Sequence, residues 1–180
     1  ACGTSGKGRM QEIDVLLATV EYALTPKTLS EKHVLITAGP TKEAIDPVRY
    51  ITNASSGKMG YAIARACLRR GAKVTLITGP SQISINHFEA FTPLTVIPVE
   101  SAADMCETTI DIFKSADISI LCAAVADFTP KYTATQKIKK QHGQTSMTIE
   151  MTMTTDIAAT LGKCKRGDQK IIGFALETHD

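Results

Sequence analysis

Apolar and polar residues alternate along the chain in blocks that predict strands separated by helices. Apolar runs bounded by glycine, proline or polar residues predict strands at 33–39, 72–79, 94–99, 117–126, 145–154 and 170–178. Apolar positions at helical spacing predict helices at 11–24, 57–71, 101–116 and 156–164. The run at 117–126 is apolar nearly throughout, as expected of a central parallel strand covered on both faces.

Strands that alternate with helices over units of about 30 residues are typical of a doubly wound sheet. We therefore predict an α/β fold, a three-layer Rossmann-like architecture with a mostly parallel sheet, over residues 33–180. Ligands of such folds bind at the carboxyl ends of the strands. The connection from Gly39 to Ser55 lies at that edge, and its 17 residues are too many for a passive turn between a strand and a helix. This edge is the predicted binding site.

Composition narrows the function classes. The 180 residues carry 20 basic and 18 acidic side chains, a net charge of +2, which argues against a nucleic-acid binder driven by bulk charge. No apolar run approaches the ~20 residues needed to cross a bilayer, and the first ten residues lack the apolar core of a signal peptide. Five cysteines without a CxxC pair are expected to be reduced thiols of a cytoplasmic protein, and we predict no metal site in the chain.

The stretch NASSGKMG, residues 53–60, predicts an anion site at the start of a helix. Ser55 or Ser56 can cap the helix, and Gly57 lets the main chain approach a bound oxygen, next to unpaired N–H groups and the positive end of the helix dipole. It is not a Walker A loop, because Met59 stands where a magnesium-binding Ser or Thr is required. The alternative is an ordinary serine cap followed by a solvated Lys58.

Two segments further along the chain could complete a nucleotide site. Small residues at 123–126 leave main-chain groups free for the edge of a base, and Asp127 could accept a ribose hydroxyl or a base amine; alternatively this is a buried strand end followed by a turn. The segment KIKK, 137–140, could reach phosphates with one face, although such charge runs are usually solvated surface. Asn53, a neutral donor and acceptor, could hold a carbonyl or an oxyanion.

Taken in order, VLITAGPTKEAIDPVRYITNASSGKMG, CAAVADFTP, KIKK and GFALET closely resemble the phosphopantothenoylcysteine synthetases of coenzyme A biosynthesis, from about residue 33 to the end. The resemblance implies a ligase that joins 4′-phosphopantothenate to cysteine. CTP would form an acyl-cytidylate with release of pyrophosphate, and cysteine would then displace CMP. Magnesium would arrive with the nucleotide, and the enzyme would be a homodimer.

The resemblance also implies roles for individual residues. Asn53 matches the asparagine that handles the acyl-cytidylate, and Lys137 matches a lysine of the CTP site; we assign both to catalysis. At Thr154-Thr155 this chain departs from the Asn-Pro expected before Asp-Ile. Together the residue patterns and the resemblance assign nucleotide binding to Gly39, Thr41, Ser55, Ser56, Gly57, Lys58, Met59, Cys122, Ala123, Ala124, Asp127, Lys137, Thr152, Met153, Thr154, Thr155 and Phe174.

Residues 1–32 are expected to be a linker and the C-terminal remnant of a flavin-dependent decarboxylase. The stretch ACGTSGKGRM resembles the end of that enzyme, in which the cysteine matching Cys2 donates a proton. FMN would be bound only if the rest of that domain were present, and the chain is expected to be a fragment that ends before the synthetase does. Two other functions stay open: a nucleotide-binding module without catalysis, and an NAD(P)-dependent oxidoreductase, which the missing GxGxxG and YxxxK patterns disfavour.

Overall fold

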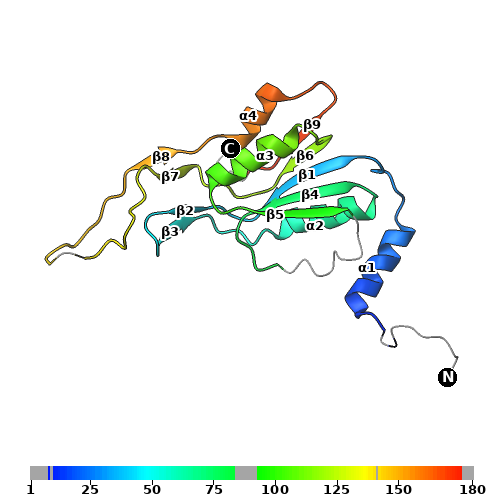
Figure 1. The fold of residues 1–180 in the computed structure, drawn as a ribbon, viewed down its shortest axis with the longest axis horizontal. Helices are drawn as coiled ribbons and strands as arrows, with labels where there is room; N and C mark the ends of the chain where they lie inside the picture. Colours follow the sequence, from blue (N-terminus) through cyan, green and yellow to red (C-terminus); the bar gives the residue numbers. More distant parts are fainter. Residues whose placement is uncertain (1–7, 9, 84–92, 141, 176–180) are drawn as a thin grey trace.

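A five-stranded parallel sheet forms the centre of the computed structural model, which describes residues 8, 10–83, 93–140 and 142–175. The order across the sheet is β5-β4-β1-β6-β9, and each neighbouring pair is parallel. The strands are β1 (His33–Ala38), β4 (Lys73–Thr78), β5 (Leu94–Pro98), β6 (Ile118–Leu121) and β9 (Lys170–Gly173). The order reverses between β1 and β6, so the carboxyl ends of these two strands form the switch point of the sheet (Figure 1).

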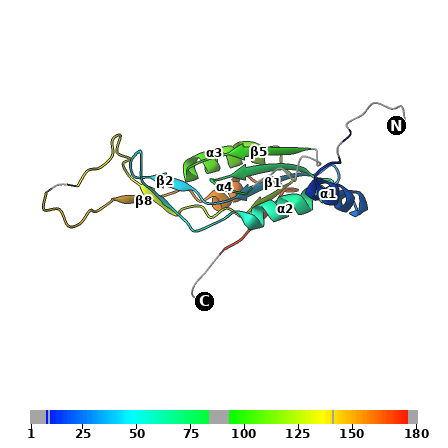
Figure 2. The same ribbon diagram turned by 90° about the horizontal axis from the view of Figure 1, so that it is seen from below.

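Helices cover both faces of the sheet. Helix α2 (Lys58–Arg69) packs on one face, where Val34 and Ile36 of β1 form a core with Leu68. Helices α3 (Ala102–Phe113) and α4 (Ile157–Cys164) pack on the other, where Leu35 and Ile77 meet Met105. Figure 2 shows α2 and α3 on opposite sides of the sheet. The predicted three-layer, Rossmann-like α/β fold is confirmed.

Two small antiparallel pairs extend the carboxyl edge of the sheet. The first is a hairpin of β2 (Lys42–Ala44) and β3 (Tyr50–Thr52). The second joins β7 (Phe128–Pro130) to β8 (Met151–Met153). Between β7 and β8 the chain runs out from the sheet as a long excursion (Figure 1), which we call the arm (residues 131–140 and 142–150 as described).

Three predicted strands are longer than the strands observed. The strand expected at 117–126 ends at Leu121, because its neighbour β1 ends at Ala38 and only a single bridge, between Pro40 and Ala124, continues the pairing. The strand expected at 145–154 is reduced to Met151–Met153, the three residues that face β7. The strand expected at 170–178 ends at Gly173, because Phe174 and Ala175 are not part of β9; its residues 176–178 lie outside the described residues.

The N-terminal helix α1 (Ile13–Leu24) docks on α2 through a different face from the one its leucines suggest. Ala18 is fully buried in the core on the α2 side of the sheet, while Leu17 and Leu24 are 56% and 79% exposed. Glu21 pairs with Arg65 and Arg69 of α2. A small residue at the contact lets the two helix backbones approach closely. Within the described ranges, no helix is both long enough and apolar enough to span a bilayer.

Candidate functional site

The loops that follow β1 and β6 lie side by side at the switch point. The N–H of Ala124 donates to the carbonyl of Gly39 at 2.9 Å, and the N–H of Ala126 donates to the hydroxyl of buried Thr41 at 3.0 Å. Gly39 has φ 74°, in the left-handed region that favours glycine. Two segments predicted to bind one ligand are therefore brought together by direct hydrogen bonds.

Asn53 joins the same group from the strand β3 side. Its Nδ2 donates to the carbonyls of Val125 and Ala124, at 3.0 and 3.3 Å. Both bonds use the amide nitrogen, so the side-chain oxygen is the atom directed away from these carbonyls. We predicted that Asn53 could act as donor or acceptor; its surroundings favour the acceptor role.

The first turn of α2 begins at a glycine and not at a serine. Gly57 is the N-cap residue, with φ 77°, and no side chain accepts a hydrogen bond from the second or third N–H group of the helix. The predicted serine cap is wrong: the hydroxyls of Ser55 and Ser56 accept from the N–H groups of Gly57 and Lys58, at 3.3 and 3.4 Å, which places them before the helix. The N–H groups of Met59 and Gly60 have no side-chain cap, and the anion site at this stretch stays a prediction.

Glycines allow the loops to cross closely at this edge. A Cβ at Gly57 would lie 3.1 Å from the nitrogen of Gly39, and a Cβ at Gly79 would lie 1.7 Å from the carbonyl oxygen of Pro40. The second contact is far inside van der Waals range, so only glycine fits there. Gly79 was missed from the sequence, although the Gly-Pro pairs that follow both β1 and β4 mark the same edge.

Several main-chain groups of 122–126 are already bonded within the protein. The N–H groups of Cys122, Ala123, Ala124 and Ala126 donate to Thr37, Gly39 and Thr41. This corrects the expectation that the segment leaves its main chain free for a base. A carbonyl oxygen has two lone pairs, so acceptors of this segment can still meet a base amine.

Thr154 fixes the end of this segment from the β8 side. Its hydroxyl donates to the carbonyl of Ala126 at 2.6 Å, and its N–H donates to the carbonyl of Asp127 at 2.9 Å. Thr154, which stands where the resemblance led us to expect asparagine, thus holds the main chain of Ala126 and Asp127. Thr152 pairs with Thr129 in the β7–β8 ladder, and Met153 is 76% exposed.

A pocket of about 730 Å³ lies between the β2–β3 hairpin, the start of α3 and the β7–β8 pair. Glu43 fastens the hairpin to α3, because its buried carboxylate accepts from the N–H of Ala102 at 2.9 Å. Of the predicted residues, the pocket lining contains Met153, Thr154 and Thr155, and not Asn53 or Gly57. The lining residues that sequence reasoning missed include Lys42, Tyr50, Ser101 and Asp104.

The hairpin itself could have been found from the sequence. Asp46-Pro47 between short alternating segments is a turn signal. The Nζ of Lys42 lies 4.5 Å from the centre of the Tyr50 ring across the hairpin, which places a cation at the pocket.

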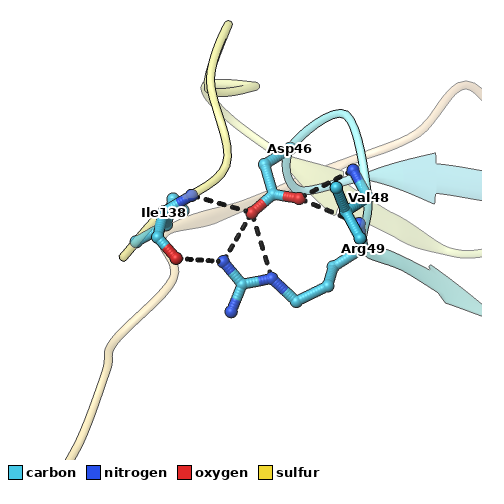
Figure 3. A network of polar contacts seen from close by, with 4 residues as sticks. All are labelled: Asp46, Val48, Arg49 and Ile138. Carbon is cyan, nitrogen blue, oxygen red and sulfur yellow. Dashed lines mark hydrogen bonds and ion pairs between the residues drawn. The ribbon is translucent and has the colours of Figure 1, made fainter. Parts of the chain in front are cut away.

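Lys137 is exposed on the arm, and its neighbour Ile138 is held by the hairpin turn (Figure 3). The carboxylate of Asp46 accepts from the N–H of Ile138 at 3.1 Å, and the guanidinium of Arg49 donates to the carbonyl of Ile138 at 2.9 Å. Gly57 belongs to a different part of the edge, at the start of α2. The idea that Lys137 and Gly57 meet at one triphosphate stays a prediction.

Cys122 and Phe174 differ in their surroundings. Burial raises the pKa of the half-buried Cys122 thiol to about 11, with a smaller contribution from Cys67, so Cys122 is protonated at neutral pH. Phe174 is 54% exposed, just after β9. Cys2 lies outside the described residues. In the part of the chain that the structure describes, no three His, Cys, Asp or Glu side chains are grouped so that they could hold a metal ion.

Comparisons with known proteins agree with this fold. Residues 29–180 match the family described as DNA/pantothenate metabolism flavoprotein C-terminal domain. The chain is 48% identical over 183 residues to the coenzyme A biosynthesis bifunctional protein CoaBC of Bacillus subtilis, with all of this chain and 43% of that protein covered. It is 46% identical over 185 residues to a cysteine/cysteine sulfinic acid decarboxylase from an unknown prokaryotic organism, with all of this chain and 50% of that protein covered.

A solved structure is similar over most of the fold. The crystal structure of the C-terminal domain of a CoaBC protein superposes with a TM-score of 0.69 at 45% identity, over 84% of this chain and 68% of that one. The chain spans about half the length, or less, of the curated relatives named above. The family match covers well over half of the 180 residues, so the chain belongs to the DNA/pantothenate metabolism flavoprotein C-terminal domain family.

Proposed function

We propose that this chain carries the phosphopantothenate–cysteine ligase activity of coenzyme A biosynthesis. In the proposed reaction, the carboxylate of 4′-phosphopantothenate attacks the α-phosphorus of CTP, and pyrophosphate leaves. The amine of cysteine then attacks the acyl carbon of the acyl-cytidylate, and CMP leaves. The substrates are 4′-phosphopantothenate, cysteine and CTP, and the active unit is a homodimer.

The observation that supports this proposal is the position of Asn53 at the switch point. Its amide is oriented by the carbonyls of Ala124 and Val125, in the same loop cluster that contains Gly39 and Thr41. An amide oxygen is a neutral acceptor, so it can receive an N–H of an attacking amine without adding negative charge beside a phosphate. Orientation of the amine is the main requirement of the second half-reaction.

The first half-reaction brings two anions together and therefore needs positive charge and oriented N–H groups. The left-handed Gly57 exposes the first turn of α2, and its contact with Gly39 forms a cradle that a Cβ would fill. The described residues offer no ready-made metal cluster. Mg²⁺ commonly binds through substrate phosphates and water with few protein ligands, so magnesium would enter with CTP and neutralise its phosphates.

The proposal also assigns the two ends of the chain. Residues 1–32 would be the linker and end of a decarboxylase domain, with Cys2 as its proton donor, and residues 33–180 would belong to the ligase. FMN would bind to that decarboxylase domain and has no role in the ligation. The relative named as a cysteine/cysteine sulfinic acid decarboxylase matches all of this chain, and the proposal assigns decarboxylation to the domain of residues 1–32 and not to residues 33–180.

Calorimetry and a pyrophosphate assay test the function. CTP, ATP and NADPH are titrated in the presence of magnesium, and pyrophosphate release is then measured with 4′-phosphopantothenate and CTP. We expect CTP to bind and pyrophosphate to be released. Binding of CTP without release would refute ligation by this chain, and binding of NADPH in place of CTP would refute the whole assignment.

Two substitutions separate the assigned roles. Lys137→Gln removes one exposed charge from the arm, and we expect about tenfold weaker CTP binding, the cost of one charged contact. The matched control is Lys163→Gln on α4, which should leave CTP binding unchanged. Asn53→Asp should lower turnover about a hundredfold with near-normal CTP binding, because a carboxylate cannot donate to the two carbonyls that orient Asn53. Normal turnover would refute that role.

A further inference from the structure

The carboxylate of Asp46 makes more hydrogen bonds than its own turn requires. Its Oδ1 accepts from the N–H groups of Val48 and Arg49, both at 2.9 Å, and these two bonds close the hairpin turn. Its Oδ2 accepts from the Arg49 guanidinium and from the N–H of Ile138, 92 residues further along the chain. The Asp46 side chain is fully shielded from solvent. Half of this carboxylate is therefore used to hold a distant peptide.

The ion pair binds both the N–H and the carbonyl of Ile138, as a neighbouring strand would (Figure 3), and we call this pair of contacts the grip on Ile138. Asp46 accepts its N–H at 3.1 Å, and Arg49 donates to its carbonyl at 2.9 Å. Two further hydrogen bonds join the arm to the hairpin. The N–H of Ala134 donates to the carbonyl of Ile45, and the hydroxyl of Thr133 donates to the carbonyl of Ala44. The main-chain positions of the residues on either side of Ile138 are thereby fixed, since consecutive Cα atoms are about 3.8 Å apart.

The ion pair of Asp46 and Arg49 does not neutralise the positive charges of the lysines on the arm. Between Asp127 and Glu150 the sequence contains four lysines and no acidic residue. The guanidinium of Arg49 holds the pKa of Asp46 well below its usual range, so both partners are charged at neutral pH and together are neutral. A lone carboxylate at this position would attract the neighbouring lysines. Paired with Arg49, it positions Lys137 and Lys139 and does not neutralise their charges, whereas Lys131 pairs with Glu150.

We propose that Asp46 and Arg49 are positioning residues, which hold the Ile138 peptide so that Lys137 and Lys139 meet the phosphates of a nucleoside triphosphate in a fixed geometry. The nucleotide part of this inference rests on the proposed function, whereas the grip on Ile138 does not. The guanidinium fork is essential to the grip, because one guanidinium binds both the carboxylate and the Ile138 carbonyl. A lysine at position 49 would keep the charge but could not make both contacts in the same plane.

The test compares Asp46→Asn and Arg49→Lys with Glu150→Gln. Arg49→Lys leaves the turn carboxylate intact, so it remains informative if Asp46→Asn folds poorly. Glu150→Gln removes another ion pair of the arm, the 2.6 Å contact with Lys131, and does not touch Ile138. Hydrogen exchange of the Ile138 amide, followed by NMR, should become about tenfold faster in the first two variants and stay unchanged in the control. Unchanged exchange in Arg49→Lys and Asp46→Asn would refute the grip.

Binding of CTP tests the second half of the proposal. Arg49→Lys should weaken CTP binding by about as much as Lys137→Gln, and the double variant should be little weaker than either single variant, because both changes remove the same contact. Additive losses, or unchanged CTP affinity with fast exchange at Ile138, would refute the positioning role while the proposed function stands. If the unaltered chain does not bind CTP, the proposed function and the nucleotide part fail together, and Ile138 exchange still decides whether the grip exists.

Discussion

Gly60 of α2 lies against β1, and replacing it with alanine tests this packing directly. A Cβ at Gly60 would lie 2.5 Å from the Cβ of Ala38, 3.2 Å from its Cα and 3.2 Å from the carbonyl oxygen of Thr37. Non-bonded carbons approach to about 3.5–4.0 Å. All three neighbours are main chain or the first side-chain carbon, so none can swing aside. The helix or the strand must move by about 1 Å.

The cost can be bounded from this geometry. Overpacking of a close-packed contact costs about 1–3 kcal/mol. Alanine is intrinsically better than glycine in a helix by up to about 1 kcal/mol, but Gly60 lies in the first turn of α2, where that gain is smaller. We expect Gly60→Ala to lower the free energy of unfolding by about 1–2 kcal/mol. For a chain of this length 1 kcal/mol corresponds to about 3 °C, so Tm should fall by about 3–6 °C.

Gly162→Ala is the matched control, because Gly162 is also helical and nothing lies within 4 Å of its added Cβ. There only the helix propensity acts, and Tm should rise by about 1–3 °C. Thermal unfolding and urea titration of both variants measure the difference. Equal changes in the two variants, or a Gly60→Ala protein as stable as the unaltered chain, would refute the reasoning that glycine is required for the approach of α2 to β1.

The remaining predictions concern a helix cap and the thiols. Ser101→Ala removes the capping box of α3, in which Ser101 and Asp104 exchange hydrogen bonds, and should cost about 1 kcal/mol of stability in urea titration. The Ser101 N–H and hydroxyl lower the pKa of Asp104, so this contribution is full above pH about 4 and is lost as the pH falls through the folded-state pKa; a stability difference independent of pH across that range would contradict it. In a Cys2→Ser background at pH 8, iodoacetamide should modify exposed Cys164 first and Cys122, with its raised pKa, slowly; peptide mapping that finds Cys122 modified as fast as Cys164 would contradict this.

The layered fold could be predicted because the pattern of apolar residues within each strand or helix depends on which of its faces are buried. A strand covered on both faces is mostly apolar, and β1 and β4 are buried along their whole length after the first residue. The predicted helix 11–24 begins two residues later, at Ile13. Periodicity identifies a helix with one apolar face, but Ala18 forms the contact because its small side chain allows close approach. Size at a contact is not visible in a hydrophobic pattern.

The loop cluster at the switch point could be predicted in part. Gly57 was identified because glycine lets the main chain approach a bound oxygen, and Gly39 because it ends the first predicted strand; both have positive φ. Their contact with each other could not be predicted, since it depends on how two loops cross. The predicted serine cap was wrong for a related reason. Gly57 takes the N-cap position in a left-handed conformation, so Ser56 and Ser55 lie one and two residues before the cap.

Local sequence patterns do not predict the structure at the base of the arm or the contacts that the arm makes. Strands β7 and β8 are three residues each, too short for alternation to be distinguished from chance, and their pairing spans about twenty intervening residues. Lys137 was identified by its charge and by the family resemblance, whereas its placement depends on Asp46 and Arg49, which bind Ile138 from 92 and 89 residues earlier in the chain. In the sequence these two residues look like ordinary turn formers. The fully shielded carboxylate of Asp46 indicates a second task, because a turn at the surface needs only one oxygen of its aspartate.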